Sequence, residues 1–173
     1  SNSCNFDVSD TTFNIVSLIV VTSPNGGESI DASGGTNGGT FNMVTNDVVI
    51  STGNFYDNGG PNGNYGSYQN ITKTFYPFNP NAKLRVYFHE FRTANSSDYL
   101  RVYDGPTTSS PLLGSYSSTT VPPTFTSTHK TGALTFRFIS NQSSVQSGWK
   151  ASMTSIHPDN HTVAWSTTGT SGE

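Results

Sequence analysis

The stretch AKLRVYFHEFRTANSSDYLRVYDG, residues 82–105, decides the fold class of this chain. It contains two runs, Leu84 to Phe91 and Tyr99 to Tyr103, in which apolar residues alternate with polar ones. Alternation with a period of two is typical of a β-strand that is buried on one face only. A short polar bend separates the runs, and Asp104-Gly105 follows the second run as a turn signal. The stretch therefore predicts two strands joined as a hairpin.

Two carboxylates lie at the ends of this predicted hairpin bend. Glu90 and Asp98 are eight residues apart and can converge on a small volume there, where their oxygens would suit a hard cation such as Ca²⁺. Acidic residues near turns are also common on solvated hairpins, so the spacing alone leaves both interpretations open. Strand alternation predicts that His89 faces away from Glu90 and does not share its site.

Length and composition narrow the class of protein. The 173 residues fit one domain, or one domain with extensions. Only 11% of the residues are charged, but 11 Phe, 8 Tyr and 2 Trp supply large side chains to bury. This composition is typical of extracellular β-proteins and fibre subunits. The net charge of −3, with 8 Lys and Arg, excludes a phosphate-binding footprint, so no nucleic-acid partner is expected. No apolar run is long enough to predict a membrane span.

Three segments resemble the CUB domain family, in particular the CUB-like modules of secreted and surface proteins of bacteria. They read FYDNGGPNGNYG, SSDYLRVYDGPTTSSPLLGSYS and TGALTFRFISNQSSVQSGWKASM, and they occur in the order of the family. The resemblance covers residues 50–156. It implies an all-β fold, an antiparallel two-sheet sandwich of the CUB-like jelly-roll type. It also implies non-catalytic recognition of proteins or glycans, so no enzyme is expected.

The resemblance adds a ligand set to the carboxylate pair. Many members bind one Ca²⁺ through a Glu, an Asp eight residues later and an Asp on a late loop, and Glu90 and Asp98 match the first two positions. The late position is Asn141 here, which offers a carbonyl oxygen, and Ser143 can help. Because one charge is missing, the affinity for Ca²⁺ should fall. The family also has an aromatic residue near the first strand, which is Tyr56 or Tyr65 in this chain.

Cysteine usage departs from that of many family members. Their disulfide positions correspond here to Tyr76 and Ala133, which implies an apolar contact in place of a crosslink. Cys4 is the only cysteine, so the chain cannot form an internal bridge. Cys4 is expected to be an idle thiol, with an intermolecular bridge or a lipid anchor as alternatives.

Four N-x-[ST] sequons are possible N-glycosylation sites. They are Asn70, Asn95, Asn141 and Asn160. Glycosylation and cation binding compete at Asn141, because one side chain cannot easily serve both.

Both ends of the chain predict further strands. Residues 1–49 form an N-terminal extension in which the strand at residues 11–22 is apolar on both faces. Its apolar residues are Phe13, Ile15, Val16, Leu18, Ile19, Val20 and Val21. Residues 157–173 form a C-terminal extension in which Val163 and Trp165 share one face. The segments SPNGGE and TVAWSTTGTSG also resemble small Ig-like modules of secreted bacterial proteins.

A strand that is apolar on both faces has to be covered on both sides. It can pack on the sandwich of its own chain or pair with a neighbouring copy, and head-to-tail pairing of copies gives a filament. The leading hypothesis is a non-catalytic extracellular structural subunit, a homo-oligomer or polymer that forms a surface fibre by donating this strand. The alternative is a Ca²⁺-dependent module of a larger secreted protein that recognises a protein or glycan in adhesion.

Overall fold

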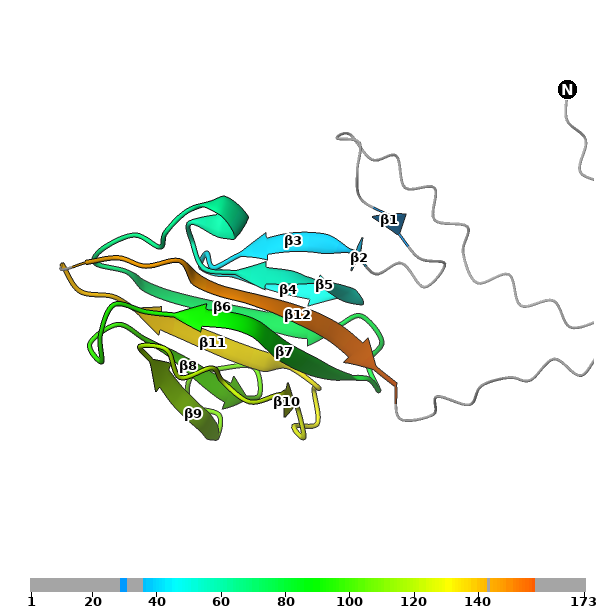
Figure 1. Ribbon diagram of the computed structural model, residues 1–173. Coiled ribbons are helices and arrows are strands. Elements are labelled where there is room, and N and C mark those ends of the chain that lie inside the picture. Colours follow the sequence, from blue (N-terminus) through cyan, green and yellow to red (C-terminus); the bar gives the residue numbers. More distant parts are fainter. Residues whose placement is uncertain (1–28, 31–35, 143, 158–173) are drawn as a thin grey trace, which may run out of the picture.

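The computed structural model describes residues 29–30, 36–142 and 144–157 as two β-sheets packed face to face (Figure 1). The seven-stranded sheet has the order β1 (Ser29–Ile30), β2 (Thr36–Asn37), β4 (Asn46–Ile50), β6 (Asn70–Pro77), β11 (Leu134–Ile139), β8 (Tyr99–Asp104) and β9 (Leu112–Ser117). The five-stranded sheet has the order β10 (Phe125–Thr126), β7 (Lys83–Arg92), β12 (Gly148–Ile156), β5 (Thr52–Tyr56) and β3 (Gly39–Asn42). A 3-10 turn, η1 (Gly60–Asn62), follows β5. The predicted all-β sandwich is confirmed.

The chain changes sheet at nearly every connection between β3 and β12. Only β8 and β9 are consecutive strands within one sheet in that range. Strands that are two apart in sequence therefore become neighbours, and β4 pairs with β6, and β3 with β5, in parallel. The sheets are mixed as a result, whereas the sequence analysis expected antiparallel pairing throughout.

The two strands of residues 82–105 exist, but the predicted hairpin between them is wrong. β7 lies in the five-stranded sheet and β8 in the seven-stranded sheet, so residues 93–98 cross from one layer to the other. Alternation reveals which side of a strand is buried, but a strand in either sheet buries its apolar side in the same interior. The sequence pattern therefore could not distinguish a hairpin from a crossing connection.

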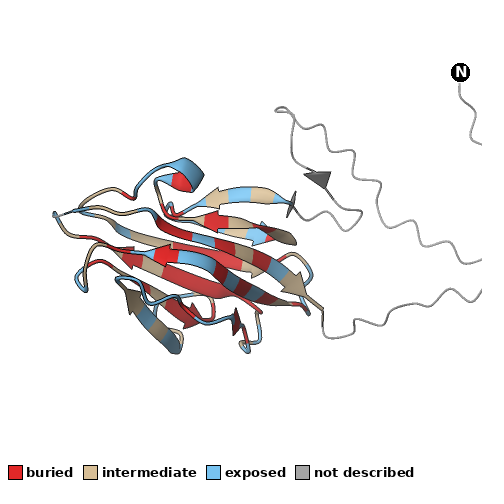
Figure 2. Cartoon of the chain, viewed as in Figure 1, coloured by how far each residue is buried: buried red, intermediate tan, exposed pale blue. Residues whose placement is uncertain are grey.

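Aromatic side chains fill the interior between the sheets, and strands of both sheets carry the buried residues (Figure 2). Phe55 from the five-stranded sheet contacts Phe75 and Phe136 from the opposite sheet, each with 5.0 Å between ring centroids. Trp149 packs on the same phenyl ring at 5.6 Å and on Phe138 at 5.1 Å. Edge-to-face pairs of this kind add to the stabilisation from burial. The two sheets are thus joined through one continuous aromatic cluster.

The sandwich begins before residue 50, where the sequence analysis placed the end of the N-terminal extension. β3 and β4 belong to the two sheets, and Met43 and Ile50 are fully buried in the core. At the positions implied for the missing disulfide, Tyr76 and Ala133 come directly next to the paired residues Phe75 and Leu134. The predicted strand at residues 11–22, the C-terminal strand, Cys4 and Asn160 lie outside the described residues.

Asp57 is a fully buried carboxylate at the end of β5. Its Oδ1 accepts a hydrogen bond from the Gly59 N–H at 2.7 Å, and its Oδ2 accepts one from the Trp149 N–H at 3.3 Å. Gly148 has φ +64°, and a Cβ atom at this position would lie 2.0 Å from Asp57 Oδ2. Burial raises the pKa of Asp57 from 3.8 to about 6, although the backbone hydrogen bonds act in the opposite direction.

This raised pKa predicts that Asp57 makes the protein less stable as the pH rises from about 4 through about 6. The protonated carboxyl is the form that burial favours, so its contribution is fully present below the unfolded pKa and is lost above the folded one. The loss is on the order of 3 kcal/mol. Urea unfolding of the wild type and of Asp57→Asn across this range measures it. The wild type should lose more stability than the variant, and equal pH dependence would contradict the assignment.

Candidate functional site

Three connections meet at one end of the sandwich, which we call the loop end: residues 57–69, 93–98, and 140–142 with 144–147 (at the left in Figure 1). Backbone hydrogen bonds hold them together. The Tyr65 N–H donates to the Gln146 carbonyl at 3.1 Å, and the Tyr68 N–H donates to the Asn141 carbonyl at 3.0 Å. The loops are therefore fixed to one another as well as to the strands.

Asp98 is the centre of the loop end. Its carboxylate is fully buried. The Tyr65 hydroxyl donates to Oδ2 at 2.7 Å, and the backbone N–H of Asn141 donates to Oδ1 at 2.8 Å. The Tyr65 oxygen in turn accepts a hydrogen bond from the Ala94 N–H at 2.8 Å. We call Tyr65, Asp98 and Asn141 the Asp98 cluster; it ties all three connections through one carboxylate.

Tyr65 is held in place on both its polar and its apolar sides. Its ring packs edge-to-face on Phe138, with 5.0 Å between centroids. Burial, followed by the hydrogen bond to Asp98, raises the pKa of the Tyr65 hydroxyl well above its ordinary value. The hydroxyl therefore stays protonated and remains a donor to Asp98. Of the two tyrosines left open by the sequence analysis, Tyr65 is the one that lies beside Asp98.

Thr93 extends this network to the residue that follows β9. Its Oγ1 donates to the Asp98 carbonyl at 2.8 Å and accepts from the Ser118 N–H at 2.7 Å. The contact between Thr93 and Ser118 was not predicted, because an isolated Thr and Ser 25 residues apart carry no pattern that would pair them.

The four sequence-predicted metal ligands are not assembled in the described part of the chain. Asp98 and Asn141 come together, but through the Asn141 backbone N–H, which cannot ligate a cation. Glu90 is exposed on the outer face of the five-stranded sheet, where it pairs in register with Lys150. Ser143 lies outside the described residues.

A β-bulge explains the position of Glu90. The register between β7 and β12 shifts at Lys150/Ala151, so His89 and Glu90 both lie between the inward-facing Phe88 and Phe91. His89 and Glu90 are both exposed, and the expectation that they face opposite sides of the strand is wrong. His89 Nε2 lies 2.6 Å from Ser152 Oγ on the same outer face.

The described side chains around Asp98 do not by themselves make up a calcium site. Ca²⁺ takes six to eight oxygen ligands, commonly with several carboxylates. Within the described ranges, no group of three or more His, Cys, Asp or Glu side chains could hold a metal ion. Both oxygens of Asp98 already accept hydrogen bonds inside the protein. Calcium binding stays a prediction from the resemblance.

The possible glycosylation sites differ in accessibility. Asn70 is exposed, and its Oδ1 accepts a hydrogen bond from Arg137 Nε at 3.2 Å. Asn95 and Asn141 are half-buried at the loop end. Their glycosylation stays a prediction, as it does for Asn160.

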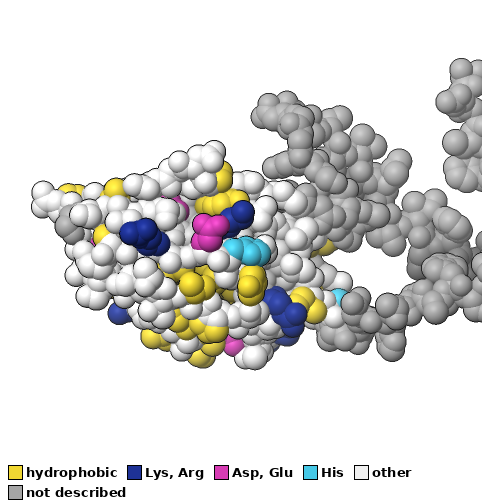
Figure 3. Space-filling view, viewed as in Figure 1, with side chains coloured by type: hydrophobic (Ala, Val, Ile, Leu, Met, Phe, Trp, Pro, Cys, Tyr) yellow, Lys and Arg dark blue, Asp and Glu magenta, His cyan; other side chains and the backbone are white. Residues whose placement is uncertain are grey.

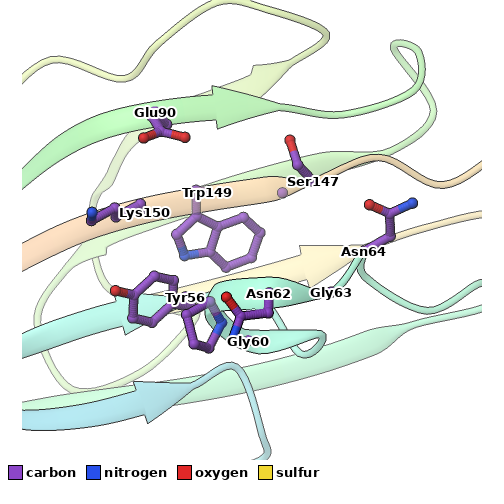
Figure 4. A pocket seen from close by; sticks show the side chains of 11 residues that line it. Tyr56, Gly60, Asn62, Gly63, Asn64, Glu90, Ser147, Trp149 and Lys150 are labelled. Atoms are coloured by element: carbon purple, nitrogen blue, oxygen red, sulfur yellow. The ribbon is translucent and has the colours of Figure 1, made fainter.

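A pocket of about 420 Å³ opens beside the loop end, on the outer face of the five-stranded sheet (Figure 4). Tyr56, Lys150 and Glu90 pair in register across β5, β12 and β7, so their side chains stand in a row along one wall. Residues 60–64 and 147–149 complete the lining. Acidic, basic and histidine side chains gather on this face in Figure 3. The pocket was not predicted, because it depends on the order of the strands within the sheet.

The Asp98 cluster predicts that Tyr65→Phe is destabilising. The variant keeps the ring but leaves Asp98 Oδ2 and the Ala94 N–H without the hydroxyl, which should cost about 1–3 kcal/mol. The control is Tyr56→Phe, which removes a hydroxyl from the pocket wall and should change stability by less than about 0.5 kcal/mol. Urea unfolding of both variants measures the difference. Equal stability of Tyr65→Phe and the wild type would show that the cluster does not hold the loops.

Comparisons with known proteins agree with this fold. The family model of the CUB domain matches residues 45–153. Cubilin from Sus scrofa is 31% identical over 121 residues, which are 66% of this chain and 3% of cubilin. The chain thus spans a small part of that relative.

Solved structures are similar at low sequence identity, which shows the fold alone. The full extracellular region of zebrafish Gpr126/Adgrg6 matches with a TM-score of 0.56 at 18% identity, over 66% of this chain and 15% of that one. The MASP-1 CUB2 domain bound to Ca²⁺ matches with a TM-score of 0.53 at 18% identity, over 64% of this chain and 98% of that one. Since the family model covers more than half of its residues, this chain belongs to the CUB domain family.

Proposed function

We propose that this chain is a non-catalytic extracellular recognition module that binds a protein or glycan ligand at the loop end and the adjoining outer face of the five-stranded sheet. The observation that carries the proposal is the pocket beside the Asp98 cluster, where exposed polar side chains surround a hollow. CUB domains are generally non-catalytic binding modules, and one matched structure is an extracellular region. Among the described residues, no helix has the length and apolar character needed to cross a membrane.

The loop end is suited to recognition because its groups are fixed before a ligand arrives. The Asp98 carboxylate joins the three connections, and the neighbouring strands fix the side chains on the outer face in register. A preorganised surface loses less conformational freedom on binding, so more of the contact energy appears as affinity.

The fibre hypothesis is not supported by the comparisons, which favour the recognition alternative. Its donor strand, residues 11–22, lies outside the described residues. Self-assembly by strand exchange therefore stays a prediction from the sequence.

Recognition by this module should not require calcium. Both carboxylate oxygens of Asp98 already accept hydrogen bonds from protein groups, and Glu90 lies on the outer face of the five-stranded sheet. We expect the unfolding temperature in millimolar CaCl₂ and in EDTA to agree within about 1 °C, since a cation that does not bind the folded state gives no stabilisation. Differential scanning calorimetry measures this. A rise of several degrees that Glu90→Gln abolishes would contradict this expectation and restore the calcium site derived from the sequence.

Direct binding tests the recognition function. Biolayer interferometry of the immobilised chain against purified extracellular glycoproteins, each with its deglycosylated form, should find saturable ligands. Lys150→Ser, on the proposed face, should weaken binding about tenfold, since about 1.4 kcal/mol corresponds to that factor. The matched control Arg137→Ser lies on the opposite sheet and should bind as the wild type does. Absence of binding to the whole panel, or equal loss in both variants, would contradict the function.

A further inference from the structure

The geometry points to the outer-face pocket as a binding site for a neutral, hydroxyl-rich saccharide unit. This inference rests on the proposed recognition function and names its site and ligand class. It is carried by the chemistry of the lining, by the balance of charge in it, and by an aromatic ring in its wall.

The pocket lining offers both hydrogen-bond donors and hydrogen-bond acceptors. Glu90 supplies acceptor oxygens, Lys150 supplies an ammonium donor, and the Asn62 amide supplies both (Figure 4). Glu90 and Lys150 are exposed, so both can reach a ligand. A sugar hydroxyl both donates and accepts, and therefore matches such a mixture better than a ligand that can only accept, such as a phosphate.

Charge in the pocket is balanced. Glu90 and Lys150 carry opposite charges and are register partners on adjacent strands, so their fields largely cancel over the pocket. An anionic ligand is attracted by Lys150 and repelled by Glu90, and for a cationic ligand the two effects are reversed. A neutral ligand pays no such penalty and can hydrogen-bond with both.

An aromatic ring completes the wall. Tyr56 is half-buried, pairs in register with Lys150 and lines the pocket. A ring with an apolar face and a polar tip can pack against the C–H face of a sugar while its hydroxyl bonds a neighbouring group.

Trp149 lies beside the pocket, although its side chain points to the opposite face of the sheet from Lys150. The indole is 2% exposed and packs on Phe55 and Phe138 in the interior. Because Trp149 is one of the pocket-lining residues (Figure 4), a ligand bound there can alter its emission.

Trp149 also gives the experiment a reporter. In the full chain with Trp165→Phe, Trp149 is the remaining tryptophan, since the sequence has two. Neutral oligosaccharides such as lactose, cellobiose, mannobiose and chitobiose are titrated while its emission is recorded, and isothermal calorimetry gives the affinity. At least one should cause a saturable change in emission, and sialyllactose or a sulfated disaccharide should bind no more tightly.

Variants then locate the site. Tyr56→Ala, in the pocket wall, should weaken saccharide binding by at least about tenfold. Tyr87→Ala is the matched control, because Tyr87 is an exposed tyrosine of the same sheet face outside the pocket lining, and it should leave the affinity unchanged.

The outcomes separate this inference from the proposed function. If no neutral saccharide binds, if a charged one binds more tightly, or if Tyr56→Ala binds as the wild type does, the saccharide site is overturned. The recognition function still stands in that case if the chain binds glycoproteins after they have been deglycosylated. If neither glycoproteins nor saccharides bind, both proposals fail.

Discussion

The packing of aromatic side chains between two sheets is the constraint on which the rest of this structure depends. Phe55, Phe75, Phe136 and Trp149 interlock across the interior, and each sheet buries its apolar side only against the other. The chain changes sheet at nearly every turn, so residues distant in sequence contribute to the same cluster. Loss of contact between the layers would therefore expose the apolar side of both sheets at once, since neither has another partner in the described residues.

The same crossing topology creates the loop end. Because β7 and β8 lie in different sheets, residues 93–98 pass over the edge of the sandwich and bring Asp98 to Tyr65 and Asn141. A buried carboxylate is costly unless it is hydrogen-bonded, and here protein groups supply the donors. The cluster thus fixes the loops in the place where a metal ion was expected, and the neighbouring outer face keeps its polar side chains exposed.

The pocket depends on strand order and on one bulge. Tyr56, Lys150 and Glu90 come from three strands that are separated in sequence but adjacent in the sheet. The bulge at His89 turns Glu90 to the outer face and away from the interior. A recognition function is consistent with this arrangement, because strands hold the side chains in place and the 60–64 loop borders the opening.

The sequence by itself determined the all-β class, the two strands within residues 82–105 and the family, because alternation and the family segments are local patterns. Tertiary structure decided which sheet each strand joins, which partners Asp98 has, and where Glu90 points. Alternation is the same for a strand in either sheet, and a bulge of one residue reverses the side on which the following residues lie. The hydrogen bonds of Asp98 come from Tyr65 and Asn141, 33 and 43 residues away, and only the packing of the two sheets brings them together.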